Sequence, residues 1–267
     1  ALWEDEFIAA SFMYKAVQFI DRHKDEPFFL YVGTNDVHVP RYPHPRFQGK
    51  SGMGFRGDAL LQFDWTVGEI MKALEKNGLA ENTLIVLTSD NGPVVDDGYQ
   101  DRAVELLGNH RPWGEFRGGK YSNFEAGTRV PLIVSWPKQV KPAVSDALVS
   151  HIDLYASMAK LMGKTLEAGA GVDSQDYLDA FLGKDTKGRD YVIEFAGALS
   201  VSDGQWKYIT PNNKPAYAKL TNTELGNSPE DQLYHLKEDI GEKNNVASEH
   251  PDIVAKLKKI LETESSK

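Results

Sequence analysis

The amino-acid sequence predicts an α/β fold, with a mixed, mostly parallel sheet between helices and a small antiparallel sheet plus helix at its C-terminal end. Two patterns indicate this fold class. In the first half, apolar runs of strand length alternate with amphipathic helical stretches, an order typical of a parallel sheet covered by helices. After about Gly163 the apolar runs become short and are separated by turn residues, which is typical of antiparallel strands.

The elements of the first half follow from their apolar periodicity. "PFFLYVGT" is a continuous apolar run that suits a strand covered on both faces. The stretch 58–78 repeats apolar residues every three or four positions and ends at Gly78, a helix stop. Together the patterns predict these helices and strands in chain order: helix 1–24, strand 27–34, helix 58–78, strand 83–89, strand 130–136 and helix 150–163.

The second half predicts a change of architecture. A Gly- and Asp-rich linker with one short helix around 176–183 separates the first part from a small α+β subdomain. The resulting division is 1–163, 164–188 and 189–267. The subdomain is expected to contain four strands and a closing helix: 190–197, 198–203, 205–211, 231–239 and 250–267.

Composition excludes several classes of protein. The net charge is −9, whereas nucleic-acid binders present basic surfaces. No run approaches the roughly 18 apolar residues of a membrane span. Cysteine is absent, which excludes disulfides, thiolate metal sites and cysteine nucleophiles within this chain. The first residues contain neither an initiator Met nor a signal region, so we expect a fragment of a longer polypeptide.

Polar residues follow the predicted strands where ligand sites of open α/β sheets form, beyond the carboxyl ends of the strands. His38 follows the first strand, Asp90 and Asn91 follow the second, and Lys120 lies in the loop before the third. We expect these four side chains to converge. Each also has a simpler interpretation: "DNG" is a common turn sequence, and single histidines and lysines often have structural or solvated roles.

The residue types point to one kind of chemistry. Asp90 and Asn91 offer a carboxylate and a carboxamide oxygen, which suit Ca²⁺ or Mg²⁺ rather than a metal that prefers thiolates. Two ligands do not complete an oxygen shell, so further carboxylates must come from elsewhere. Lys120 and His38 can hold the oxygens of a tetrahedral anion and protonate a leaving oxygen. The combination indicates transfer of a sulfuryl or phosphoryl group.

Three stretches resemble landmarks of the type I sulfatases, which share the alkaline-phosphatase-like fold. They are "PFFLYVGTNDVHVP", "LLQFDWTVGEIMKALEKNGLAENTLIVLTSDNGP" and "RGGKYSNFEAGTRVPLIVSWP". The similarity continues, in order, through nearly the whole chain. It departs at Ile240, where the family commonly has Pro.

The resemblance implies roles for the same four residues. Asp90 and Asn91 become two calcium ligands, Lys120 a clamp on the sulfate oxygens, and His38 a sulfate contact and proton donor to the leaving alcohol. The family attacks sulfur with the hydrate of formylglycine, made from a Cys or Ser in a C/S-x-P-x-R motif. This chain contains no such motif. We therefore expect it to have neither sulfatase activity nor tight calcium binding by itself, and to need an N-terminal segment or another chain against an exposed sheet edge.

Alternatives remain at this point. Zinc-dependent phosphoesterases of the same fold often place Asp–His where this chain has Asp–Asn, so Asn91 favours a sulfatase. A formylglycine-dependent phosphate or phosphonate ester hydrolase stays open. A non-catalytic glycan-binding pseudoenzyme is the alternative from another class.

The substrate is expected to be a sulfated carbohydrate or aryl compound. The loop 91–116 should overhang the pocket, and such loops set specificity on a rigid scaffold. Candidate substrate contacts, each with a structural role as the alternative, are His110, Arg111, Trp113, His44 and Arg46. The resemblance favours an exported protein, in the periplasm or outside the cell.

Overall fold

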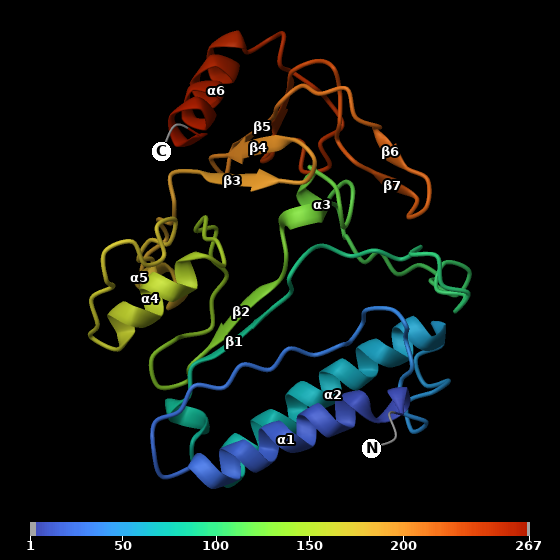
Figure 1. The fold of residues 1–267 in the computed structure, drawn as a ribbon, viewed down its shortest axis with the longest axis vertical. Coiled ribbons are helices and arrows are strands. Elements are labelled where there is room, and N and C mark those ends of the chain that lie inside the picture. The colour runs from blue at the N-terminus through green and yellow to red at the C-terminus, as the bar shows by residue number, and fades with distance from the viewer. Residues whose placement is uncertain (1–3, 266–267) are drawn as a thin grey trace. The chain divides into compact units, whose positions relative to one another are not determined.

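The computed structural model describes residues 4–265 as two compact units (Figure 1). Within the described chain, the first unit comprises residues 4–84, 94–112 and 136–138. The second comprises residues 85–93, 113–135 and 139–265. Residues 1–3 of the predicted opening helix and residues 266–267 of the predicted closing helix lie outside the described part.

Two helices dominate the first unit. After the short 3-10 helix η1 (Asp5–Phe7), α1 (Ile8–His23) packs beside α2 (Gly54–Lys76), as Figure 1 shows; η2 (Ala80–Asn82) follows. Their C-terminal ends are joined by a 2.7 Å hydrogen bond from Asn77 Nδ2 to Asp21 Oδ1. Gly78 adopts a φ of +70° and donates to Glu75 O, so the predicted helix stop is confirmed. No helix between residues 4 and 265 is long and apolar enough to cross a membrane.

The prediction of a mostly parallel sheet is wrong. The strands β1 (Ile85–Thr88) and β2 (Leu132–Ser135) form a two-stranded antiparallel pair in which Thr88 lies opposite Leu132. Parallel neighbours need a crossover that carries the chain to the opposite end of the strand. The connection between β1 and β2 instead contains only the four-residue helix α3 (Glu125–Thr128) and returns to the end where β1 finished. The described residues contain small antiparallel sheets only.

The predicted strand 27–34 also differs from the structure. No strand is assigned there, although the segment runs as an extended line along α1 and α2 in Figure 1. Its side chains alternate as in a strand: Phe28 and Leu30 are half-buried, whereas Phe29 and Tyr31 are 83% and 82% exposed. A strand needs a hydrogen-bonded neighbour. None of the described residues forms a strand beside it.

The small antiparallel sheet lies where the sequence predicts it. Its strands, in spatial order, are β3 (Val192–Phe195), β4 (Leu199–Ser202), β5 (Trp206–Ile209) and β8 (Gln232–His235). One face packs on α6 (Pro251–Ser265), the predicted closing helix. This core is apolar and tightly buried, and its members are Val201, Tyr208, Leu233, Val254, Leu257 and Leu261.

The opposite face of this sheet supports the segment that precedes and forms α3. Side chains alternate between the two faces of a strand, so Tyr208 contacts α6 whereas Lys207 and Ile209 point the other way. There Ile209 and Tyr234 form a second apolar cluster with Phe124. The remaining elements of this unit are α4 (Asp153–Leu161), α5 (Leu178–Phe181), β6 (Tyr217–Ala218) and β7 (Thr223–Glu224).

Candidate active site

The chain bends at Asp90 and Asn91, one residue after β1 ends at Thr88, and we call this bend the Asp90–Asn91 turn. The backbone N–H of Asn91 donates to Asp90 Oδ1 at 3.0 Å, and Asn91 Nδ2 donates to the carbonyl of Gly92 at 2.9 Å. The second bond orients the Asn91 amide, so that its oxygen lies on the side of the group away from that carbonyl. Asp90 is exposed and Asn91 half-buried. The pair therefore lies at a bend in the chain, where both residues offer side-chain oxygens.

Gly92 fixes this turn against α3. Its backbone N–H donates to the carbonyl of Gly127 at 2.9 Å. A Cβ placed on Gly92 would lie 1.6 Å from the carbonyl oxygen of Ala126, which is far inside any van der Waals contact. Only glycine fits this close approach of two backbones. The "DNG" sequence therefore has a packing requirement beyond turn formation.

Lys120 lies on the adjoining turn. Its backbone N–H donates to the carbonyl of Pro93 at 2.8 Å. A Cβ on Gly119 would come within 2.8 Å of that same oxygen, so the two turns are in direct contact. The Lys120 side chain is half-buried, with Nζ 5.5 Å from the ring centroid of Tyr121. The structure thus places the turn that carries Lys120 in backbone contact with the segment directly after Asp90 and Asn91. Convergence of the three side chains stays a prediction.

His38 belongs to the first unit. Its ring is exposed, and Nδ1 lies 2.7 Å from the carbonyl oxygen of Val39. Because a carbonyl only accepts, this contact assigns the proton to Nδ1 and leaves Nε2 as the second ring nitrogen that can carry a proton. Its backbone N–H donates to the carbonyl of Asn35 at 2.9 Å. The convergence of His38 with the other three residues stays a prediction.

The five candidate substrate contacts have different surroundings. The Arg46 guanidinium lies 3.5 Å from the ring centroid of Trp65, and the His44 ring packs edge-on against Phe7 at 5.0 Å. Both side chains therefore have structural contacts within the first unit. His110 and Arg111 are exposed, and Trp113 is half-buried. A role for any of the five in substrate binding remains a prediction.

The profile of the family described as Sulfatase matches residues 6–164, which is more than half of the chain. This chain belongs to the sulfatase family. The resemblance of the sequence to sulfatases is thereby confirmed. The sulfatase family is part of the alkaline-phosphatase-like superfamily.

Individual sulfatases agree with this assignment. A curated N-acetylgalactosamine-6-O-sulfatase of Bacteroides thetaiotaomicron is 54% identical over 98% of this chain and 52% of its own length. A solved structure from the same organism, described under metabolism of multiple glycosaminoglycans, has a TM-score of 0.98 at 54% identity and covers 100% of this chain and 56% of its own. A sulfatase from Pseudoalteromonas sp. shares the fold, with a TM-score of 0.81 at 24% identity over 98% of this chain and 53% of its own. The chain spans about half the length of such relatives.

The donor set of the sulfatase chain fits a hard cation in part. Asp90 and Asn91 supply a carboxylate and a carboxamide oxygen, the ligand types that Ca²⁺ prefers. No group of three or more His, Asp or Glu side chains within residues 4–265 is arranged to hold a metal. Ca²⁺ takes six to eight oxygens. These two residues can therefore form one side of a calcium site and not the whole of it.

Sequence reasoning missed a buried arginine in the first unit of the sulfatase chain. The Arg41 side chain is 0% exposed and forms ion pairs with Asp97 at 2.8 Å and Asp101 at 2.6 Å. Its Nε also donates to the carbonyl of Val37 at 3.0 Å. These bonds join the segment that carries His38 to the loop that follows Val94. The partners are separated by 56 and 60 residues, so no local pattern indicates them.

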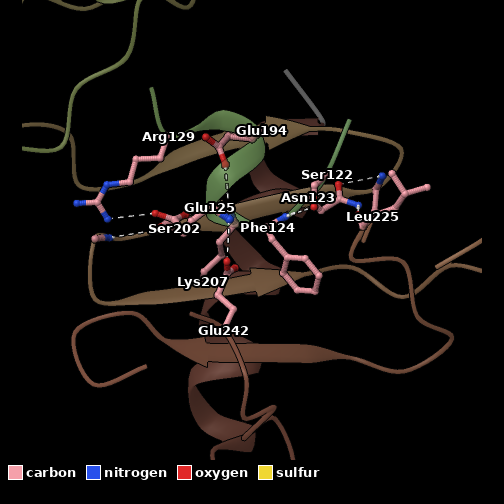
Figure 2. A network of polar contacts seen from close by, with 12 residues as sticks. Ser122, Asn123, Phe124, Glu125, Arg129, Glu194, Ser202, Lys207, Leu225 and Glu242 are labelled. Carbon is pink, nitrogen blue, oxygen red and sulfur yellow. Dashed lines mark hydrogen bonds and ion pairs between the residues drawn. The ribbon is translucent and has the colours of Figure 1, made fainter. Parts of the chain in front are cut away.

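A second missed feature is the buried ion-pair network behind α3 (Figure 2). Lys207 Nζ lies 2.9 Å from Glu125 Oε1 and 3.3 Å from Glu194 Oε2, and Arg129 approaches Glu125 from the far side at 3.2 Å. Burial alone would lower the pKa of Lys207, but attraction to the surrounding carboxylates outweighs it and raises that pKa. Burial would raise the pKa of Glu125, yet Lys207 and Arg129 hold it below its usual value. The sequence signal was a lysine in the middle of the apolar strand β5.

Proposed function

We propose that the protein containing this chain is a sulfatase that hydrolyses sulfate esters of a glycan, with 6-O-sulfated N-acetylgalactosamine as its substrate class. Membership of the sulfatase family supports the reaction. The substrate class rests on a relative that is 54% identical and carries the name N-acetylgalactosamine-6-O-sulfatase.

The observation that carries the proposal is the contact between two turns. Hydrogen bonds from Gly92 to Gly127 and from Lys120 to Pro93 hold the backbone directly after Asp90 and Asn91 against the lysine segment. A divalent cation and an ammonium group on adjoining turns provide the positive charge that a sulfate monoester and its transition state require.

Each residue has a role in this reaction. Asp90 and Asn91 would hold one side of a Ca²⁺ ion, or of Mg²⁺ in its place, and the bound ion would supply positive charge to the sulfate oxygens. Lys120 binds sulfate oxygens through its ammonium group. His38 gives a proton to the leaving alcohol oxygen, and its Nδ1 bond to the carbonyl of Val39 limits rotation of the ring.

The nucleophile would be a formylglycine, whose hydrated aldehyde would supply the attacking hydroxyl. The chain contains no Cys and no S-x-P-x-R motif, so this group has to come from another part of the parent protein or from another chain. We therefore expect this polypeptide alone to be inactive towards sulfate esters.

The segment 27–34 provides a surface for that additional part. Phe29 and Tyr31 are 83% and 82% exposed on a segment whose side chains alternate with strand periodicity. An unpaired strand presents backbone donors and acceptors that another strand can satisfy. We propose that a strand from another part of the parent protein, or from another chain, pairs with it.

The test is steady-state kinetics of the parent protein on 6-O- and 4-O-sulfated N-acetylgalactosamine, an aryl sulfate and an aryl phosphate. We expect turnover of the 6-O-sulfated sugar in preference to the 4-O-sulfated one and to the phosphate. Lys120→Ala should lower kcat/KM for the sulfate ester by about 10²–10³-fold, because it removes a charged group from the transition state. Lys219→Ala removes an exposed lysine and serves as the control.

Three outcomes would overturn parts of the proposal. Faster turnover of the aryl phosphate would identify a phosphate ester hydrolase. Binding of sulfated glycans without hydrolysis would identify a pseudoenzyme. Equal kcat/KM for Lys120→Ala and Lys219→Ala would remove Lys120 from the site.

A further inference from the structure

Both ends of the Lys120 segment bind to one residue of the C-terminal subdomain, Glu242. Before the segment, Arg117 Nη1 donates to the backbone carbonyl of Glu242 at 2.5 Å. After it, the backbone N–H of Glu125 donates to Glu242 Oε2 at 2.7 Å. Figure 2 shows Glu242 below α3 in this network. A single residue therefore restrains the chain on both sides of Lys120.

The conformation of Glu242 is unusual for a glutamate. Its backbone φ is +49°, in the left-handed region that Gly and Asn adopt at lower cost. The residue is 0% exposed, and its second carboxyl oxygen, Oε1, is buried without a hydrogen-bond partner among the described residues. Burying an acid in this way costs free energy. Backbone strain together with a buried acid indicates that the side chain serves a function other than packing.

The restraint extends to the Asp90–Asn91 turn. Glu242 accepts a hydrogen bond from the backbone N–H of Glu125, the first residue of α3. Near the other end of this short helix, the carbonyl of Gly127 accepts from the backbone N–H of Gly92. Lys120 itself donates to Pro93 through its backbone. A shift of α3 or of the segment before it would therefore change the position of both turns.

We propose that Glu242 is a positioning residue for the sulfatase site, which sets Lys120 relative to Asp90 and Asn91 without touching the substrate. This inference rests on the proposed function. Its physical basis is that misplacement of a charged group by about 1 Å can cost on the order of 10²-fold in rate.

Two substitutions in the parent protein separate the side-chain bond from the backbone. Glu242→Gly removes the carboxyl acceptor, relieves the positive φ and keeps the carbonyl that accepts from Arg117. Glu242→Gln keeps an oxygen that can accept from the Glu125 amide. We expect Glu242→Gly to lower kcat on the sulfate ester at least about tenfold, more than it changes KM, and Glu242→Gln to stay within about threefold of the parent. Glu238→Gly, at a side chain that is 82% exposed in the same loop, is the matched control.

Hydrogen–deuterium exchange gives a second readout that needs no activity. Amides of residues 118–128 should exchange faster in Glu242→Gly than in the parent, Glu242→Gln or Glu238→Gly. If Glu242→Gly does not fold, Glu242→Asn takes its place, because Asn suits a positive φ but is one methylene too short to reach the Glu125 amide. Parental kcat and parental exchange in the Gly or Asn variant would overturn the inference. If the parent hydrolyses no sulfate ester, the proposed function fails, and the exchange result alone decides the role of Glu242.

Discussion

Replacing Lys207 by Met should destabilise the protein strongly. The side chain is 0% exposed, and its ammonium lies within 2.9 Å of Glu125 and 3.3 Å of Glu194. Methionine is similar in length, so the substitution removes the charge with little change in volume. Among residues 4–265, Glu125 then keeps its ion pair with Arg129, whose side chain is 50% exposed, and Glu194 loses its ion pair with Lys207. Removing one partner of a buried ion pair costs about 3–5 kcal/mol.

The measurement is the thermal midpoint Tm of the parent protein by circular dichroism. At about 2–4 °C per kcal/mol for a domain of this size, the expected loss is roughly 10 °C. Lys256→Met is the control, because the Lys256–Asp203 pair at 3.1 Å has a lysine that is 64% exposed and should contribute under about 1 kcal/mol. Adding Glu125→Gln to Lys207→Met should restore part of the Tm. A Tm for Lys207→Met equal to that of Lys256→Met would refute the reasoning.

Three further predictions follow from other features. Gly92→Ala should lower kcat/KM at least about tenfold, because the added Cβ would lie 1.6 Å from the backbone carbonyl oxygen of Ala126. The control Gly68→Ala, which adds a Cβ in open space on α2, should preserve kcat/KM. Burial raises the pKa of Glu242 to about 7, against the opposing attraction of Lys207, so the proton binds more tightly in the folded state than in the unfolded state. In urea titrations, the free energy of unfolding of the parent relative to Glu242→Gln should therefore be largest below pH 4.5. It should fall by about 3 kcal/mol as the pH rises through 7. Phe29→Ser with Tyr31→Ser should reduce self-association of the isolated chain in sedimentation velocity, since both side chains are more than 80% exposed; unchanged association would contradict the proposed edge.

The helices and the small antiparallel sheet were predictable because their signals are local. The repeat of apolar residues every three or four positions located α2, and Gly78 marked its end. The short strands between turn residues located the sheet that packs on α6. The direction of β2 relative to β1 was not predictable from alternation, because alternation describes the order of elements and not the path of the loop between them. The long apolar run at 27–34 was likewise insufficient to predict a strand, because a strand also needs a neighbouring strand to form hydrogen bonds with.

The candidate site was predictable in part. The turns that carry Asp90, Asn91 and Lys120 follow from strand ends and motif spacing, and the structure places these turns in contact. The residues that hold the turns were not predictable. Lys207 is 82 positions from Glu125, and Glu242 is 117 positions from it, so only the folded chain reveals their bonds. A long-range polar network has no periodicity in the sequence that could indicate it.

The most direct test of the central claim is a crystal structure of the parent protein with Ca²⁺ and a sulfated N-acetylgalactosamine. We expect a calcium ion within about 2.3–2.6 Å of side-chain oxygens of Asp90 and Asn91, and the sulfate group in contact with Lys120 and His38. A calcium ion bound elsewhere, or a sulfate group that touches neither Lys120 nor His38, would contradict it.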